Sequence, residues 1–167
     1  SSDASAADAR MRWLVTAETA LDDSDTGAGA RVTAFFTAAD SLAGNPGSAL
    51  GRQAMLSALD DATSAIRTSS DALTRVSAGI ASEAQTTVDS LNANLQTLAS
   101  VNLALRRLGT DSTSRASLSD QRDQLIDSIA AQIGVTATLD DSGVATLTLT
   151  GSSALLLDNA SPAHLSL

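Results

Sequence analysis

Apolar residues recur at intervals of three and four along the first part of the chain, which is the spacing of helices with one buried face. Two such segments are present, at residues 3–21 and 30–43. Between them, Asp22–Gly29 is acidic and contains glycine, which predicts a turn. Gly44–Gly47 ends the second segment, because its proline cannot continue helical hydrogen bonding.

A much longer helix is predicted after Ser48, which is a candidate N-cap. No proline occurs from there to Leu108, and a heptad seam runs through Leu59, Ala62, Ile66, Ser69, Leu73, Val76 and Ile80. An extra four-residue step follows Ile80, and the seam then continues, with Val101 or Asn102 as alternatives near its end. These residues predict one helix of about 60 residues, roughly 90 Å long. We expect Leu59, Ile66 and Leu73 to lie in the core of an elongated antiparallel helical bundle.

The pattern changes toward the C-terminus. After a polar turn at Gly109–Ser114, a helix is predicted from Ser117 or Ser119 to Ile133, with Gly134 ending it. Apolar residues then alternate with period two in Val135–Leu139 and Val144–Thr150, which predicts a β-hairpin. Ala154–Leu157 is a candidate third strand.

The predicted fold is therefore mainly α, with a small C-terminal β-hairpin. We expect a helical rod domain at residues 1–134, the hairpin at residues 135–157 packed on it, and a loose tail at residues 158–167.

Composition narrows the possible functions. The chain of 167 residues has no cysteine and one histidine, which argues against disulfide scaffolds, zinc sites and Ser–His–Asp catalysis. Its net charge is −9 and its arginines are dispersed, so we expect neither nucleic acid nor a membrane as a partner. Only 2% of the residues are aromatic, which favours close helix packing over a deep ligand pocket. No basic segment followed by an apolar one opens the chain, and we expect no Sec signal peptide.

Candidate chemistry is sparse. The acidic loop that begins at Asp22 resembles a calcium loop, but its twelfth position is Thr33, which cannot supply the bidentate carboxylate. Asp60 and Asp61 are adjacent and therefore point to different faces of a helix. Asp120 and Asp123 share a face but have no evident acid–base partner, and His164 lies in the predicted tail. We expect no catalytic residue, metal or cofactor.

Two stretches resemble a known family. The first has Phe35-Phe36-x-Ala38 on a short helix, followed by Asn45-Pro46, Ser48 and Arg52. The second is Leu118–Ile126, which contains Asp120-Gln121-Arg122-Asp123. Together with the order of helices and hairpin, these residues resemble the flagellar hook-associated protein 1 family, which forms the first hook–filament junction. The resemblance covers most of residues 10–157 and corresponds to a middle fragment without the family's terminal polymerisation regions.

The resemblance implies an extracellular, non-enzymatic component of the bacterial flagellum, exported through the type III pathway. It implies hook protein and the second junction protein, hook-associated protein 3, as partners. Self-association would use the missing termini, so the fragment itself is expected to be monomeric. Phe35 and Phe36 are expected to anchor the core, and Asp120, Arg122 and Asp123 to form a polar network.

Other readings of the sequence remain open. Another axial protein, either flagellin or hook-associated protein 3, shares the helical character, although the Asp-Gln-Arg-Asp string favours hook-associated protein 1. An extracellular helical adhesin or binding module would carry a flanking membrane anchor. An enzyme would require a pocket with converging titratable groups.

Overall fold

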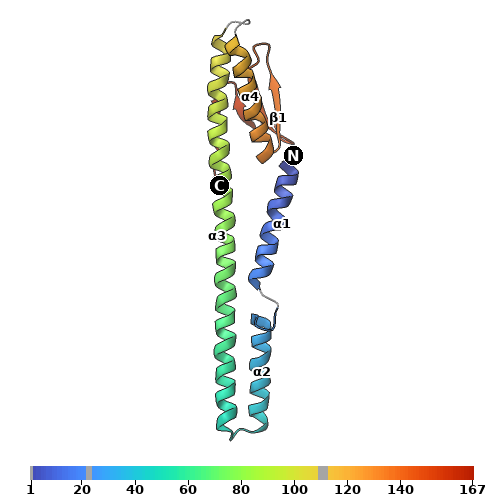
Figure 1. Cartoon of the computed structure of the whole chain (residues 1–167), viewed down its shortest axis with the longest axis vertical. Helices are drawn as coiled ribbons and strands as arrows, with labels where there is room; N and C mark the ends of the chain where they lie inside the picture. Colours follow the sequence, from blue (N-terminus) through green and yellow to red (C-terminus); the bar gives the residue numbers. More distant parts are fainter. Residues whose placement is uncertain (1, 22–23, 109–112) are drawn as a thin grey trace. The chain divides into compact units, whose positions relative to one another are not determined.

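The computed structural model describes residues 2–21, 24–108 and 113–167. Within them lie four helices followed by four strands: α1 (Ser2–Leu21), α2 (Ala28–Gly44), α3 (Ala49–Arg107), α4 (Thr113–Gln132), β1 (Val135–Leu139), β2 (Ala145–Leu149), β3 (Leu155–Asp158) and β4 (Ser161–Pro162). Figure 1 shows these elements in sequence colours. The predicted mainly α fold, with a long helix and a small C-terminal β structure, is confirmed.

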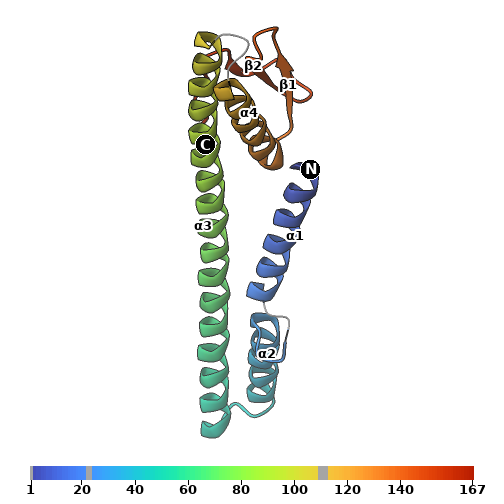
Figure 2. The same ribbon diagram turned by 45° about the horizontal axis from the view of Figure 1, so that its top comes forward.

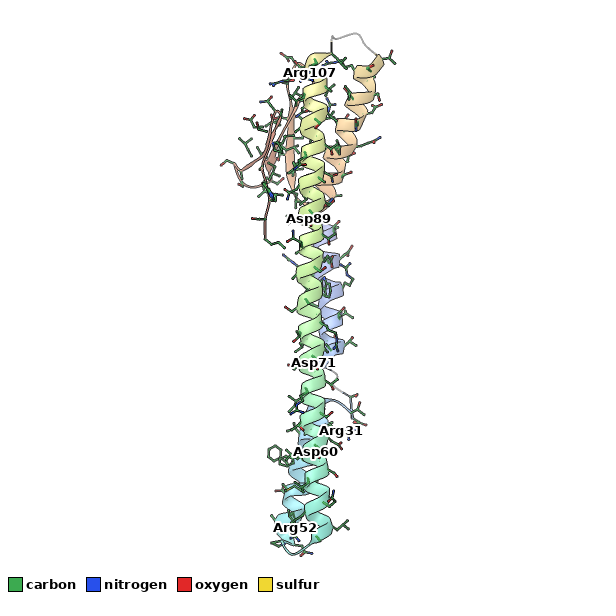
Figure 3. All side chains as sticks on the ribbon, turned by 90° about the vertical axis from the view of Figure 1, so that its left-hand side faces the viewer. Arg31, Arg52, Asp60, Asp71, Asp89 and Arg107 are labelled. Carbon is green, nitrogen blue, oxygen red and sulfur yellow. The ribbon has the colours of Figure 1, made fainter. Side chains whose placement is uncertain are left out.

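Helix α3 is a single helix of 59 residues, as its proline-free run of helically spaced apolar residues predicts. Ser48 caps its N-terminus, because the Ser48 hydroxyl accepts a hydrogen bond of 2.9 Å from the Gly51 N–H. Nearby, Arg52 donates to the Pro46 carbonyl at 3.0 Å, at the end of α3 where Figure 3 labels it. Arg106 and Arg107 occupy the last turn, where positive charge complements the helix dipole.

The chain divides into two compact units. Met11–Ile80 forms one, the helical unit, while Ser1–Arg10 and Ala81–Leu167 form the other, the sheet unit. This division differs from the predicted boundaries at residues 134/135 and 157/158. The reason is that α3 changes its packing partners without a break in the helix, so no turn marks the boundary, which coincides with the four-residue step after Ile80.

The core of the sheet unit lies between the last part of α3, α4 and the sheet, which Figures 1 and 2 show side by side. Its fully buried side chains come from all three layers: Leu95, Leu98, Leu105, Ile129, Leu147 and Leu157. Along β2, the buried Ala145 and Leu147 alternate with the partly exposed Thr146 and Thr148. One face of the strand therefore packs on the helices, as its period-two pattern predicts.

The four strands are antiparallel and pair in the order β1-β2-β3-β4. The first hairpin closes through Asp140, whose carboxylate accepts hydrogen bonds from the N–H groups of Ser142 at 2.8 Å and Val144 at 2.9 Å. Gly143 completes the turn at a φ of 71°, a conformation that favours glycine. Both hairpin strands lie where the sequence predicts them, and β3 lies close to the predicted third strand.

Two details at the C-terminal end differ from the predictions. Helix α4 begins at Thr113, so Ser117 and Ser119 lie inside it rather than at its cap. Most of the predicted turn at Gly109–Ser114 lies outside the described residues. The predicted loose tail instead adds strand β4, and the Leu165 N–H and C=O both bond to the Asn92 amide, at 2.9 and 3.0 Å.

Candidate functional site

The two phenylalanines of the recognisable motif lie on α2 and have different environments. Phe35 is partly buried, whereas Phe36 is 60% exposed. Their rings contact each other, with centroids 5.3 Å apart. The expectation that both anchor the core therefore differs from the structure at Phe36. Adjacent residues on a helix point about 100° apart, so one helix face cannot bury both rings.

The long seam of α3 also differs from the prediction in the helical unit. Leu59, Ile66 and Leu73 are 38%, 50% and 39% exposed, and Ile80 is 45% exposed. The less exposed face of α3 instead consists mainly of small residues: Gly51, Ala58, Ala62, Ala65, Ser69, Ala72, Val76 and Gly79. Both rows follow heptad spacing, and the small-residue row is the one that faces the other helices, because Leu42 of α2 lies beside Gly51 and Trp13 of α1 lies beside Gly79.

Trp13 of α1 packs against this small-residue row. A Cβ atom added at Gly79 would lie 2.4 Å from one ring carbon of Trp13 and 3.0 Å from a second. The only tryptophan in the chain is thus seated on a glycine of α3. Any larger residue at position 79 would force the indole to move.

Two of the three residues predicted to form a polar network on α4, Arg122 and Asp123, are bonded to each other. Arg122 is buried and donates to the Asp123 carboxylate and to the Gly143 carbonyl, at 2.8 and 2.7 Å. These bonds attach α4 to the β1–β2 turn. Asp120 is exposed on the same helix. A second arginine, Arg115, donates to the Ser142 carbonyl of the same turn.

Asn102 is a key residue that the sequence offered only as an alternative to Val101. It is fully buried on α3, and its amide donates to the Ala145 and Asn159 carbonyls and accepts from the Ala145 N–H. One side chain thereby connects α3 to β2 and to the β3–β4 turn. The signal in the sequence was an asparagine at a seam position that apolar residues otherwise occupy.

Among the residues that the structure describes, the titratable groups do not assemble into a reaction centre. In a groove of the helical unit lined by α1, α2 and α3, Arg31 and Asp61 form an ion pair at 3.9 Å. His164 is exposed, and its ring nitrogen contacts the Leu165 carbonyl at 2.8 Å.

Metal binding and membrane insertion find no support in the described part of the chain. Over residues 2–21, 24–108 and 113–167, no three His, Cys, Asp or Glu side chains are grouped so that they could hold a metal ion. Two aspartates of the acidic loop considered for calcium, Asp22 and Asp23, lie outside these ranges. None of the described helices is both long enough and apolar enough to cross a bilayer.

These observations first indicate the class of protein to which the chain belongs. A 59-residue helix that carries a small antiparallel sheet at one end, with its buried polar groups bonded to backbone, is the architecture of a structural helical protein. Residues 14–167 match the family model described as the flagellar hook-associated protein FlgK helical domain, and the chain belongs to this family.

A solved structure has the same fold. The flagellar hook junction protein FlgK from Burkholderia pseudomallei aligns with a TM-score of 0.76 at 18% sequence identity. The alignment covers 90% of this chain and 26% of that protein, so the 167 residues correspond to about a quarter of it. No curated protein sequence matches the chain.

Proposed function

We propose that this chain is the helical part of a non-enzymatic protein that joins the flagellar hook to the filament. The observation that carries the proposal is the match of residues 14–167 to the FlgK helical domain. The described structure supports a structural role, because α3 contributes to both compact units as one helix.

The absence of an enzymatic role is supported by how the charged side chains are used. Arg31 pairs with Asp61, Arg122 pairs with Asp123, and Arg115 and Arg122 bond to backbone carbonyls of the β1–β2 turn. In these contacts the charged groups bind other parts of the chain. Acid–base catalysis instead needs titratable groups that converge on a substrate.

The partners we propose are hook protein on one side and hook-associated protein 3 on the other, in the extracellular flagellum. Export would follow the flagellar type III pathway without a cleaved signal peptide. Axial assembly would use segments outside these 167 residues. The support is membership of the family and the fold shared with a solved flagellar hook junction protein.

The test is deletion, in the source bacterium, of the gene that encodes this chain. We expect cells with hooks but no filaments, and the intact gene on a plasmid should restore the filaments. A plasmid copy with Leu98→Pro, which breaks α3 within the buried core, should not restore them.

Immunogold labelling of the complemented cells locates the protein. We expect label only at the boundary between hook and filament. Label along the whole filament would identify a flagellin instead, and normal filaments on the deletion strain would refute a junction role.

A further inference from the structure

The exposed side of α3 in the helical unit carries a second heptad seam. Its large members, Leu59, Ile66, Leu73 and Ile80, repeat every seven residues and are 38–50% exposed. The positions between them are small and polar: Thr63, Ser70 and Ser77. Leu56, which is 51% exposed, extends the seam by one step toward the start of α3. We call Leu56–Ile80 on this side the outer seam.

The outer seam is distinct from the row that already packs within the unit. The inner row includes the buried Ala62 and the partly buried Ala65 and Ser69, whereas the neighbouring Ile66 is half exposed. Side chains spaced alternately three and four residues apart form a row on one side of a helix. A second helix can pack against such a row by knobs-into-holes packing. Large aliphatic residues in such a row are unfavourable in water, so the outer seam favours a helical partner.

We propose that the outer seam binds the outer seam of a second copy of this chain in an antiparallel, two-fold symmetric pair. In one register, Leu56 of one copy lies opposite Leu73 of the other. Leu59 then lies opposite Ser70, and Thr63 opposite Ile66. At the centre of this register Leu59 and Ile66 each face a small residue, and at each end Leu56 packs against Leu73.

Charge selects this register and orientation. Asp60 and Arg67 are exposed on one flank of the outer seam, each directly after a large aliphatic residue. In the proposed register, Asp60 of each copy lies beside Arg67 of the other, so the two-fold axis produces two ion pairs. A shift by one heptad in either direction places Arg67 against Arg67 or Asp60 against Asp60. A parallel pair would not bring Asp60 near Arg67.

This inference goes beyond the proposed function and does not depend on it. It concerns the 167 residues alone and replaces the sequence-based expectation that they remain monomeric. The partner is identified by the seam itself, because a symmetric antiparallel pair matches its spacing, the large and small residues at its centre and its flanking charges.

The experiment is analytical ultracentrifugation of the 167-residue chain from micromolar to millimolar concentration. We expect a reversible monomer–dimer equilibrium. Ile66→Ser should weaken dimerisation by about tenfold or more, because it removes an apolar contact from the centre of the interface. Leu50→Ser is the matched control, because Leu50 is an exposed leucine of α3 outside the outer seam and should leave the equilibrium unchanged.

Charge reversal tests the register. Asp60→Arg alone and Arg67→Asp alone should each weaken the dimer, and the double variant should restore it, because each pair is then rebuilt with opposite polarity. Circular dichroism and the melting temperature should stay at the parent values, since both side chains are exposed.

Three results would overturn the proposal. A monomer at every concentration would show that the outer seam serves a helix of another polypeptide segment or of a different protein. A dimer insensitive to Ile66→Ser would place the interface elsewhere. A double charge reversal that fails to restore association would reject this register.

Discussion

Buried polar side chains determine how the strands attach to the helices in the sheet unit. Asn102 on α3 satisfies both backbone groups of Ala145, and Arg122 on α4 bonds to the Gly143 carbonyl. Apolar contacts hold the layers together but have little directionality, whereas hydrogen bonds fix which residues lie opposite each other. These two side chains therefore set the position of β2 and of its preceding turn on the helices.

Asn102→Ala tests this role. The substitution leaves the N–H and C=O of Ala145 without their side-chain partner in a buried site, so we expect the free energy of unfolding to fall by about 2–4 kcal/mol. Urea unfolding followed by circular dichroism measures the change. Gln96→Ala, at an exposed position of the same helix, should change stability by less than about 0.5 kcal/mol. Equal effects of the two substitutions would contradict the assignment.

Gly79 provides a second test at the residue scale. Gly79→Ala should destabilise the chain by about 1–3 kcal/mol, because the new methyl group would overlap the Trp13 ring. Thermal unfolding followed by the fluorescence of Trp13 reports on this contact directly, since it is the only tryptophan.

Gly29→Ala is the matched control for Gly79. Nothing lies within 4 Å of a Cβ atom added at this position of α2, so alanine should stabilise the helix by about 0.5–1 kcal/mol. The two substitutions are chemically identical, so a shared sign would show that helix propensity, and not the Trp13 contact, dominates at position 79.

At the scale of elements, α3 is the organising structure of both units. Its two ends are specified locally, by the Ser48 cap at one end and by Arg106 and Arg107 at the other. Its middle contains no residue that would stop a helix. Its faces, in contrast, are assigned by packing: small residues face α1 and α2, and large aliphatic residues form the outer seam.

Ser48→Ala should cost about 1 kcal/mol of stability, because the Gly51 N–H loses its side-chain acceptor at the first turn of α3. Ser57→Ala, an exposed substitution inside the same helix, should be neutral or slightly stabilising, since alanine has the higher helix propensity. Chemical denaturation of both variants measures the difference. A cost at Ser57 that matches the cost at Ser48 would argue against the cap.

At the scale of the whole molecule, the net charge of −9 opposes the association of chains through their exposed apolar residues. Exposed Leu and Ile side chains favour association, and mutual repulsion of negatively charged chains limits it to complementary contacts.

Solubility should therefore depend strongly on pH. We expect a minimum near the sequence pI of about 4.2, where the net charge vanishes and nothing opposes apolar association. Turbidity measured across an acid titration checks this expectation. A solubility minimum near neutral pH would show that exposed apolar surface, rather than net charge, controls association.

Local signals in the sequence determined the helices and the hairpin. The heptad repeats, the cap at Ser48, Pro46 and the period-two alternation after Gly134 act over a few residues, so they predict elements without knowledge of their partners. The motif containing Phe35-Phe36 and the string Asp120–Asp123 indicated the family, which the match to the FlgK helical domain confirms.

Only the tertiary structure decided which helix faces are covered and which residues join distant elements. Leu59 and Ala62 both satisfy a heptad pattern, and sequence alone favours the larger side chain, yet Ala62 is buried and Leu59 is exposed. The bonds of Asn102 to Ala145 and Asn159 span 43 and 57 residues, and strand β4 in the predicted tail exists through its pairing with β3. Such contacts depend on geometry between segments that no local pattern encodes.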